Sequence, residues 1–309
     1  MGRLKKPHPS WVILALLSVQ LLFGVNYVVS KVVVDTLPPL VWASGRMLIA
    51  AFCMLVVALV LRRPHPKGGA AFFGPLVVFS MFGIVINQSC FLVGLHYTTP
   101  SNSAVLNTLT PIFTLMIVTM RGQERKDLRK VFGFLCAFAG VLVLRKVEEF
   151  TLSNQTALGD LLIIMNCLSF SYFIAFGKRF LEKHDQFWTT AWLFLYGSVG
   201  LTAMALPEWT HFSLPPMNQR LLACILFAIF GGTLLTYFLN NWTLKYAKSS
   251  HVALFIYIQP VIAIALAWLW MGHAPTLRTL LSCGLIFLGM LIALSREPNL
   301  GFILGENRS

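Results

Sequence analysis

The sequence contains few charged residues, and acidic residues are the scarcest of them. Only 11% of the 309 residues are charged, with 11 Asp and Glu against 24 Lys and Arg, whereas 57% are hydrophobic. An ordinary soluble domain carries about 25% charged residues, so the composition excludes that class. Apolar runs of roughly 17 to 25 residues, long enough to cross a bilayer core as a helix, recur along the chain. We therefore predict an all-α membrane protein.

Acidic residues are also missing from the interior of the predicted spans. All of them lie at span ends or in connections, whereas ion-coupled carriers usually keep an acid at depth. This argues against a proton antiporter with a membrane glutamate and is compatible with a uniporter or a facilitated exporter. Lys31 or a histidine is still able to carry a proton. The acidic residues are Asp35, Glu124, Asp127, Glu148, Glu149, Asp160, Glu182, Asp185, Glu208, Glu297 and Glu306.

The sequence also lacks the groupings of side chains that metal centres and active sites need. The six cysteines have no CxxC spacing and fall inside predicted spans, where cysteine is a small apolar packing residue. The seven histidines are scattered at span ends and in connections. We predict no metal, cofactor or disulfide. An intramembrane enzyme acting on a lipid-linked substrate is the least favoured function, because catalysis needs converging acids, a His cluster or a nucleophile with its base.

Ten apolar runs are long enough to be spans, and the connections are too short to hold a soluble domain. They are Trp11–Val34, Leu40–Leu61, Phe72–Tyr97, Ser101–Met120, Leu128–Leu144, Leu158–Leu181, Thr189–Leu206, Leu221–Tyr246, Ser250–Met271 and Leu277–Leu294.

Basic residues gather on one side of these spans. A net charge of +13 suggests nucleic acid in a soluble chain, but here Lys and Arg lie at span ends. With the N-terminus in the cytoplasm, eighteen of the 24 basic residues fall in cytoplasmic segments. The positive-inside rule therefore places both termini in the cytoplasm, and we predict no nucleic-acid partner. The compact connections suit a bacterial inner membrane, and a monomer is compatible with everything in the sequence.

Residues 83–142 recur, diverged, as residues 232–291 at a constant offset of 149, the separation of Pro111 and Pro260. The agreeing positions include Gly83 with Gly232 and Tyr97 with Tyr246, residues with backbone or interface roles. A unit of five spans duplicated in tandem must insert its second copy upside down. Accordingly, a connection rich in Lys and Arg in one copy corresponds to a connection poor in them in the other. We predict two inverted five-helix repeats, residues 1–147 and 148–309.

The sequence resembles the EamA-type branch of the drug/metabolite transporter superfamily over nearly its whole length. The resemblance rests on an opening aromatic-Gly-small-Asn-aromatic pattern, a Leu-Pro-Pro motif, a lone Arg and two matching prolines. In the family a Gly-Glu pair usually follows the ninth helix, whereas this chain has Gly272-His273 at that place. The residues concerned are Phe23–Tyr27, Leu37–Pro39, Arg46, Tyr97–Ser101, Pro111, Gly122–Arg125, Gly140-Val141, Gly159-Asp160 and Pro260.

The resemblance implies ten helices and a central cavity lined mainly by helices 1, 3, 4, 6, 8 and 9. It also implies transport of small metabolites, often outward, without fixing the cargo. Among the residues themselves, polar side chains within spans are expected to face the protein interior or a wet cavity. Interhelical hydrogen bonding is the alternative. The candidate substrate-binding residues are Tyr27, Lys31, Asn87, Gln88, Asn107, Tyr172, Thr236, Tyr237, Asn240 and Tyr257.

Helical spacing groups some of these candidates. Thr233, Thr236, Tyr237 and Asn240 follow the i, i+3, i+4, i+7 pattern and are predicted to share one face. The repeat places Asn87 opposite Thr236 and Gln88 opposite Tyr237. Pro111 and Pro260 interrupt corresponding spans, which is the best sequence indication of a transporter site.

Two cations lie within predicted spans. Lys31 is able to hold a carboxylate or phosphate, but Asp35 at i+4 near the interface favours a simple ion pair. Arg46 lies deeper and needs partners such as backbone carbonyls or Asp35. Because the family keeps this Arg outside the usual cavity, the resemblance implies a structural role for it.

The pattern as a whole predicts a secondary transporter for a small polar metabolite, such as an amino acid, that works by rocking of the two repeats. Export is the direction that the resemblance implies. The predicted cavity residues are rich in Tyr, Asn and Thr and poor in net charge, which suits a small net-neutral cargo. A carrier or flippase for a lipid-linked or sugar-type cargo remains the alternative, because it shares the fold.

Overall fold

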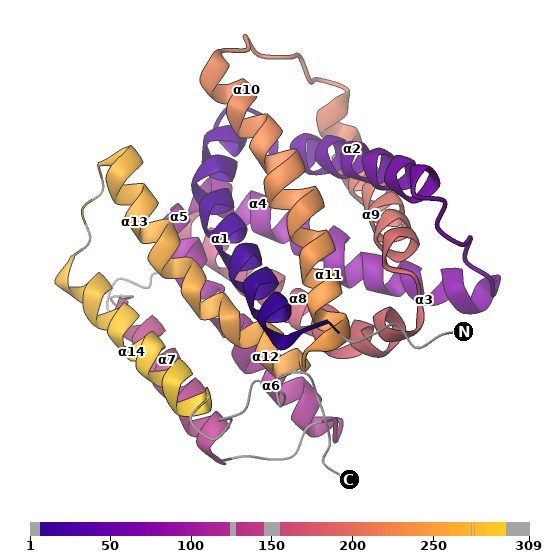
Figure 1. The fold of residues 1–309 in the computed structure, drawn as a ribbon. Helices are drawn as coiled ribbons and strands as arrows, with labels where there is room; N and C mark the ends of the chain where they lie inside the picture. Colours follow the sequence, from indigo (N-terminus) through magenta and orange to yellow (C-terminus); the bar gives the residue numbers. More distant parts are fainter. Residues whose placement is uncertain (1–6, 124–127, 145–154, 273, 275, 295–309) are drawn as a thin grey trace.

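The computed structural model describes residues 7–123, 128–144, 155–272, 274 and 276–294, and within these ranges all regular structure is helical (Figure 1). Eight helical stretches of these ranges are long and apolar enough to cross a membrane. With the further helices α7 and α14, the described ranges contain ten helical stretches in all. The predicted all-α fold of two five-helix repeats is confirmed.

The first repeat contains five helical stretches, two of them interrupted. They are α1 (Pro9–Val34), α2 (Pro39–Val60), α3 (Ala70–Ser80) continued by η1 (Met81–Ile86) and α4 (Asn87–Tyr97), α5 (Pro100–Leu106) followed by α6 (Leu109–Met120), and α7 (Leu128–Leu144).

The second repeat follows the same plan. Its stretches are α8 (Gln155–Lys183), α9 (Gln186–Trp209), α10 (Gln219–Leu226) continued by η3 (Phe227–Leu235) and α11 (Thr236–Tyr246), α12 (Ser249–Leu254) with η4 (Phe255–Ile258) and α13 (Gln259–Met271), and α14 (Leu277–Leu294).

Local sequence signals set where several helices begin. Pro9, Pro39 and Pro100 occupy the first helical positions of α1, α2 and α5, where the missing N–H costs nothing and the fixed φ suits the helix. Asp185 caps α9, since its Oδ1 accepts hydrogen bonds from the backbone N–H groups of Phe187 and Trp188 at 3.0 and 3.2 Å.

The third span of each repeat contains a π-helical segment where the sequence predicts a continuous α-helix. The segments η1 and η3 end at Ile86 and Leu235, which are 149 residues apart. In η3 the Thr233 hydroxyl donates to the carbonyl of Ala228, five residues back, at 2.7 Å. A wider turn of this kind is often found at functional sites.

The fourth span of each repeat is interrupted one turn before its proline. In the first repeat, α5 stops before Asn107 and the backbone N–H of Thr110 donates to the Asn107 carbonyl at 3.0 Å. Pro111 has no N–H to offer that carbonyl, which explains the local rearrangement. In the second repeat the 3₁₀ turn η4 precedes Pro260 in the same way.

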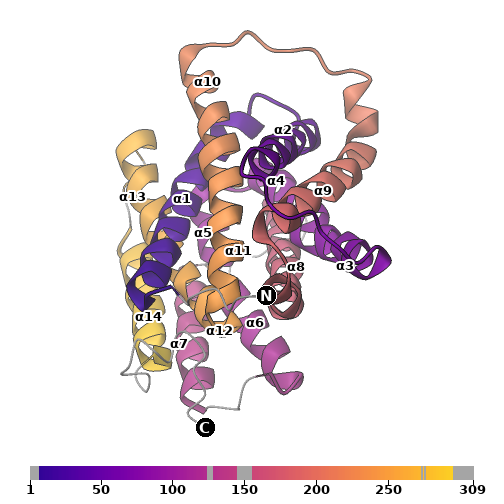
Figure 2. The same cartoon turned by 45° about the vertical axis from the view of Figure 1, so that its right-hand side comes forward.

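The repeats interlock rather than lying apart. Helix α2 packs along α9, and α7 packs along α14, in both Figure 1 and Figure 2. Helix α1 packs mainly against α11 and α13 of the second repeat, whereas α8 packs against α4 and α6 of the first. Each repeat therefore places its first helix in the other half, and side chains of both halves meet at the centre.

Glycines allow the close crossing of α7 and α14. A Cβ on Gly140 lies 2.8 Å from the carbonyl oxygen of Ser282, and a Cβ on Gly289 lies 2.3 Å from that of Gly133. Gly133 and Ser282 are themselves 149 residues apart, so the crossing obeys the repeat symmetry.

Candidate functional site

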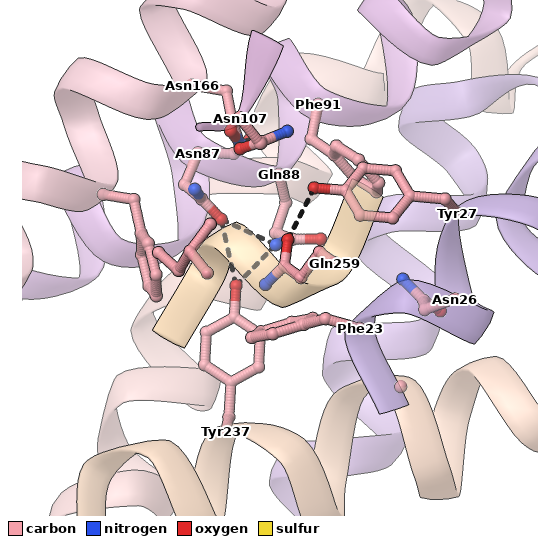
Figure 3. A pocket seen from close by; sticks show the side chains of 13 residues that line it. Phe23, Asn26, Tyr27, Asn87, Gln88, Phe91, Asn107, Asn166, Tyr237 and Gln259 are labelled. Atoms are coloured by element: carbon pink, nitrogen blue, oxygen red, sulfur yellow. Dashed lines mark hydrogen bonds between the residues drawn. The ribbon is translucent and has the colours of Figure 1, made fainter. Parts of the chain in front are cut away.

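A small polar cavity lies at the centre of the bundle, where the two repeats meet (Figure 3). Its volume is about 50 Å³, which holds a few water molecules. Counted along the ten helical stretches, the lining comes from the first, third, fourth, sixth, eighth and ninth. This is the set that the family resemblance implies. The lining residues are Phe23, Asn26, Tyr27, Asn87, Gln88, Phe91, Asn107, Asn166, Phe170, Gly232, Tyr237, Ile256 and Gln259.

One wall of the cavity is a hydrogen-bonded triangle of Asn87, Gln88 and Tyr237 (Figure 3). The Gln88 amide group donates from Nε2 to Tyr237 Oη at 2.5 Å and to Asn87 Oδ1 at 2.7 Å. The Tyr237 hydroxyl donates to Asn87 Oδ1 at 3.0 Å. Gln88 and Tyr237 are 149 residues apart, so the prediction that they face each other across the pseudo-twofold axis is confirmed.

Arg46 of α2 lies behind this triangle. Its side chain is buried, with 1% of the residue exposed, and Nη2 donates to Gln88 Oε1. The guanidinium lies 5.7 Å from the centroid of the Trp42 ring, a cation–π distance. The partner of Arg46 is therefore a cavity side chain, and Asp35 pairs with Lys31 instead.

A second chain of hydrogen bonds crosses between the repeats at the opposite wall. Tyr27 Oη donates to Gln259 Oε1 at 2.9 Å, and Gln259 Nε2 donates to Gln20 Oε1 at 2.6 Å. All three residues are buried. Because buried polar groups left unpaired are costly, this chain fixes α1 against the start of α13.

Asn26 and Gly232 bring α1 and η3 into close contact beside the cavity. A Cβ on Gly232 lies only 2.2 Å from Asn26 Oδ1, so no larger residue fits there without movement. Aromatic rings complete this region. The ring of Phe23 lies edge-on to Tyr237 at 6.2 Å, and Tyr27 lies edge-on to Phe91 at 5.5 Å between centroids.

Asn107 and Asn166 lie together at one end of the cavity, the end opposite Tyr237 in Figure 3. Asn107 lies at the interruption between α5 and α6, where its Nδ2 donates to the Ser103 carbonyl at 3.1 Å. Asn166 of α8 donates from Nδ2 to the backbone carbonyl of Asn87 at 3.0 Å. This bond joins the first helix of one repeat to the third of the other.

The structure brings five of the ten predicted binding residues together. Tyr27, Asn87, Gln88, Asn107 and Tyr237 line the cavity. The other five lie outside its lining.

Lys31 lies at the end of α1, away from the cavity lining. Its Nζ pairs with Asp35 Oδ1 at 3.0 Å and donates to the carbonyls of Leu95 and His96 at 3.2 and 2.8 Å. The ion pair that the i+4 spacing favours is therefore present, and the lysine also binds carbonyl groups at the end of α4.

The remaining four predicted residues have neighbours other than the cavity. The Thr236 hydroxyl donates to the Gly231 carbonyl of its own helix at 2.6 Å. Tyr172 stacks on Phe176 with centroids 4.1 Å apart. Asn240 and Tyr257 are buried outside the lining. Thr233, Thr236, Tyr237 and Asn240, which the sequence predicts to share one face, are all buried, and of these four only Tyr237 lines the cavity.

The predicted set omits eight lining residues. Asn166 and Gln259 could have been identified from the sequence, because both are polar residues inside apolar spans. Asn166 has polar neighbours at helical spacing, and Gln259 stands next to Pro260. The apolar members, such as Phe170 and Ile256, show no sequence signal that separates them from ordinary packing residues. They belong to the cavity only because the bundle folds them toward it.

The cavity offers amide, hydroxyl and aromatic groups for recognition. Within the described part of the chain no acidic or basic side chain lines it. Such groups are suited to hydrogen bonding and stacking with a small polar molecule.

Comparison with known proteins gives a consistent picture. The model of the EamA-like transporter family matches the chain twice, at residues 9–146 and 157–295. An uncharacterized transporter, YoaV, of Bacillus subtilis (strain 168) is 23% identical over 286 residues, covering 90% of this chain and 95% of the relative. An uncharacterized transporter of Archaeoglobus fulgidus is 25% identical and covers 93% of this chain and 99% of its own length.

A plant relative and a solved structure extend the similarity. A WAT1-related protein of Arabidopsis thaliana is 22% identical over 309 aligned positions, covering 91% of this chain and 81% of the relative. A crystal structure superposes with a TM-score of 0.70 at 18% identity, covering 92% of this chain and 96% of the other. At that identity the superposition shows a shared fold.

Proposed function

The chain belongs to the EamA-like transporter family, is a multi-pass membrane transporter, and on this premise we propose that it exports a small polar metabolite, such as an amino acid, by alternating access. The observation that carries the proposal is the cavity at the centre of the bundle, lined by both repeats. A site shared by two inverted repeats is reached from opposite sides as one repeat rocks against the other.

The moving units of this proposal are residues 1–147 and 148–309. The Gln88–Tyr237 bond and the Tyr27–Gln259 bond both join one unit to the other at the cavity. A cavity of about 50 Å³ is much smaller than the 300 to 1,000 Å³ of typical ligand sites, so admission of a metabolite requires these contacts to part. The same hydrogen-bonded side chains then become available to the cargo.

The proposed location is the cytoplasmic membrane, with both termini in the cytoplasm. The supporting observation is the charge asymmetry of the connections, for which Arg62, Arg63 and Lys67 against a Lys- and Arg-free turn at 96–99 are an example. Single cysteines introduced at Lys67 and at Thr210 in a cysteine-free background test this orientation. A membrane-impermeant maleimide applied to intact cells is expected to label Thr210→Cys but not Lys67→Cys. The reverse labelling contradicts the orientation.

The first measurement of function is a thermal-shift screen of the detergent-solubilised protein against amino acids, organic acids, sugars, nucleosides and quaternary cations. A ligand that binds only the folded state raises stability by about 2.7 kcal/mol at one hundred times its Kd. Compounds that stabilise the protein are then loaded into proteoliposomes for flux measurements. The proposal fails if no compound moves in either direction while a relative transports under the same conditions.

A further inference from the structure

Arg46 introduces a positive charge beside an otherwise uncharged cavity. The residue is 1% exposed and lies inside the apolar helix α2. A charged side chain within a membrane span is costly and usually faces the bundle interior with a partner. Among the described residues its only hydrogen-bond acceptor is Gln88 Oε1, and its Nε and Nη1 groups have none. A neutral amide oxygen compensates such a charge less than a carboxylate does.

The charge occupies one side of the pseudo-twofold axis. Gln88 and Tyr237 are repeat equivalents, but the residue of α9 that packs on Tyr237 is the buried Phe194. Phe194 lies edge-on to Tyr237 with centroids 5.5 Å apart. The two halves of the site therefore differ in charge, with a cation behind Gln88 and an apolar ring behind Tyr237.

Gln88 is the only described side chain that joins this cation to the cavity. Its Oε1 accepts from Arg46, while its Nε2 donates to Asn87 and Tyr237 at the cavity wall. The Gln88 side chain therefore lies between the guanidinium and the cavity. A carboxylate there pairs with the guanidinium through two parallel hydrogen bonds, one to each oxygen, and carries the opposite charge, whereas an amide offers one neutral oxygen.

We propose that the cavity selects a cargo that carries a carboxylate, that this carboxylate pairs with Arg46, and that Gln88 Oε1 is the exchangeable acceptor that it displaces. The inference rests on the proposed transport function and names its substrate class. It favours amino acids and organic acids over amides and over quaternary cations, because no described acidic side chain lines the cavity to receive a positive charge.

The direct test compares carboxylates with their own amides. Alanine, leucine, phenylalanine, lactate and succinate, each beside the matching amide, are screened by thermal shift and by flux from proteoliposomes containing the full-length protein. At least one carboxylate is expected to bind and move, with its amide at least about tenfold weaker, the ratio that one charge-assisted hydrogen bond supplies. Arg46→Gln is expected to lose that preference and Arg46→Lys to keep part of it.

A second measurement needs no ligand, and its arm in the wild-type background covers the case in which Arg46→Gln folds poorly. Gln88→Glu places a carboxylate beside the guanidinium, so it is expected to raise the Tm in the wild-type background and to weaken carboxylate binding by occupying Arg46. In the Arg46→Gln background the same change buries an unpaired acid and is expected to lower the Tm. Lys67→Gln, an exposed residue, is the control for removal of one positive charge.

The outcomes separate the inference from the proposed function. Transport of amides or cations as readily as carboxylates overturns the inference and leaves the transporter proposal standing. Equal effects of Gln88→Glu on the Tm in both backgrounds also overturn the inference, because Arg46 then does not pair with the new carboxylate. Absence of flux for every compound, with an active relative in parallel, counts against both.

Discussion

Lys31 and Lys178 make the same ion pair in the two repeats. Lys31 Nζ lies 3.0 Å from Asp35 Oδ1, and Lys178 Nζ lies 2.9 Å from Glu182 Oε1, each acid being four residues further along its helix. The two lysines stand near the ends of the first helices of their repeats, α1 and α8. A pair kept in both copies belongs to the architecture of the repeat unit.

Each lysine also donates hydrogen bonds to carbonyl groups at the end of the third span of its own repeat. Lys178 donates to the carbonyls of Leu244 and Ala247 at 2.9 and 2.6 Å, as Lys31 does to Leu95 and its neighbour. Leu244 is the repeat equivalent of Leu95. The last carbonyls of a helix lack partners within the helix, and a cation there satisfies them and the helix dipole.

Removal of either amine is expected to destabilise the fold without changing cargo affinity. Lys31→Met and Lys178→Met each lose a partly buried charge-assisted contact, with an expected cost of about 1 to 2 kcal/mol. Thermal unfolding and the KM of proteoliposome flux measure the two effects, with the exposed Lys67→Met as the control. A raised KM for Lys31→Met at an unchanged Tm contradicts this and makes Lys31 a cargo ligand.

Removal of the Tyr237 hydroxyl is expected to impair transport more than folding. Tyr237→Phe keeps the aromatic packing but leaves the Gln88 and Asn87 amides one partner short, a loss of about 1 to 2 kcal/mol. An effect of that size on cargo binding is about tenfold in affinity. Flux and thermal unfolding are compared with those of Tyr172→Phe, whose ring stacks on Phe176 outside the lining. Equal losses of flux in both variants oppose the assignment.

Gly232→Ala is expected to force α1 and η3 apart. The new methyl group meets Asn26 Oδ1 at 2.2 Å, and overpacking of this kind costs about 1 to 3 kcal/mol. Gly284→Ala in α14 is the matched control, because its Cβ meets nothing within 4 Å and alanine stabilises a helix by about 0.5 to 1 kcal/mol. Opposite shifts in Tm are the expected result, and a neutral Gly232→Ala speaks against the close contact.

Gln20 and Gln259 are expected to be energetically coupled. Gln259→Leu leaves Gln20 Oε1 and the Tyr27 hydroxyl without their partner, and each unpaired buried group costs about 1 to 3 kcal/mol. Gln20→Leu alone leaves Gln259 Nε2 unpaired. The double variant is expected to be less destabilised than the sum of the singles by about 1 kcal/mol, measured by denaturation of the purified protein. Simple additivity contradicts the contact.

The architecture was predictable from the sequence because its signals are long and repeated. Ten apolar runs, the offset of 149 and the re-sorted charges each depend on many residues. The prediction of Leu128–Leu144 as a span has the same bounds as α7. Pro111 and Pro260 mark the interruptions in both copies, since the missing N–H of proline acts locally.

The site was less predictable because its residues depend on helix phase and on distant partners. Thr236 and Tyr237 are neighbours in α11, yet the Thr236 hydroxyl donates to the Gly231 carbonyl while Tyr237 lines the cavity, and residue type alone does not separate the two. Similarly, the carbonyl partners of Lys31 belong to a helix more than sixty residues away, which no local pattern reveals.

The two π segments also show where the repeats are alike and where they differ. Both segments end at corresponding positions, Ile86 and Leu235, directly before the polar residues Asn87 and Thr236. They begin differently, because η1 has 6 residues and η3 has 9. The wide turns therefore keep the start of α4 and of α11 equivalent, while the preceding parts of the two spans are not equivalent.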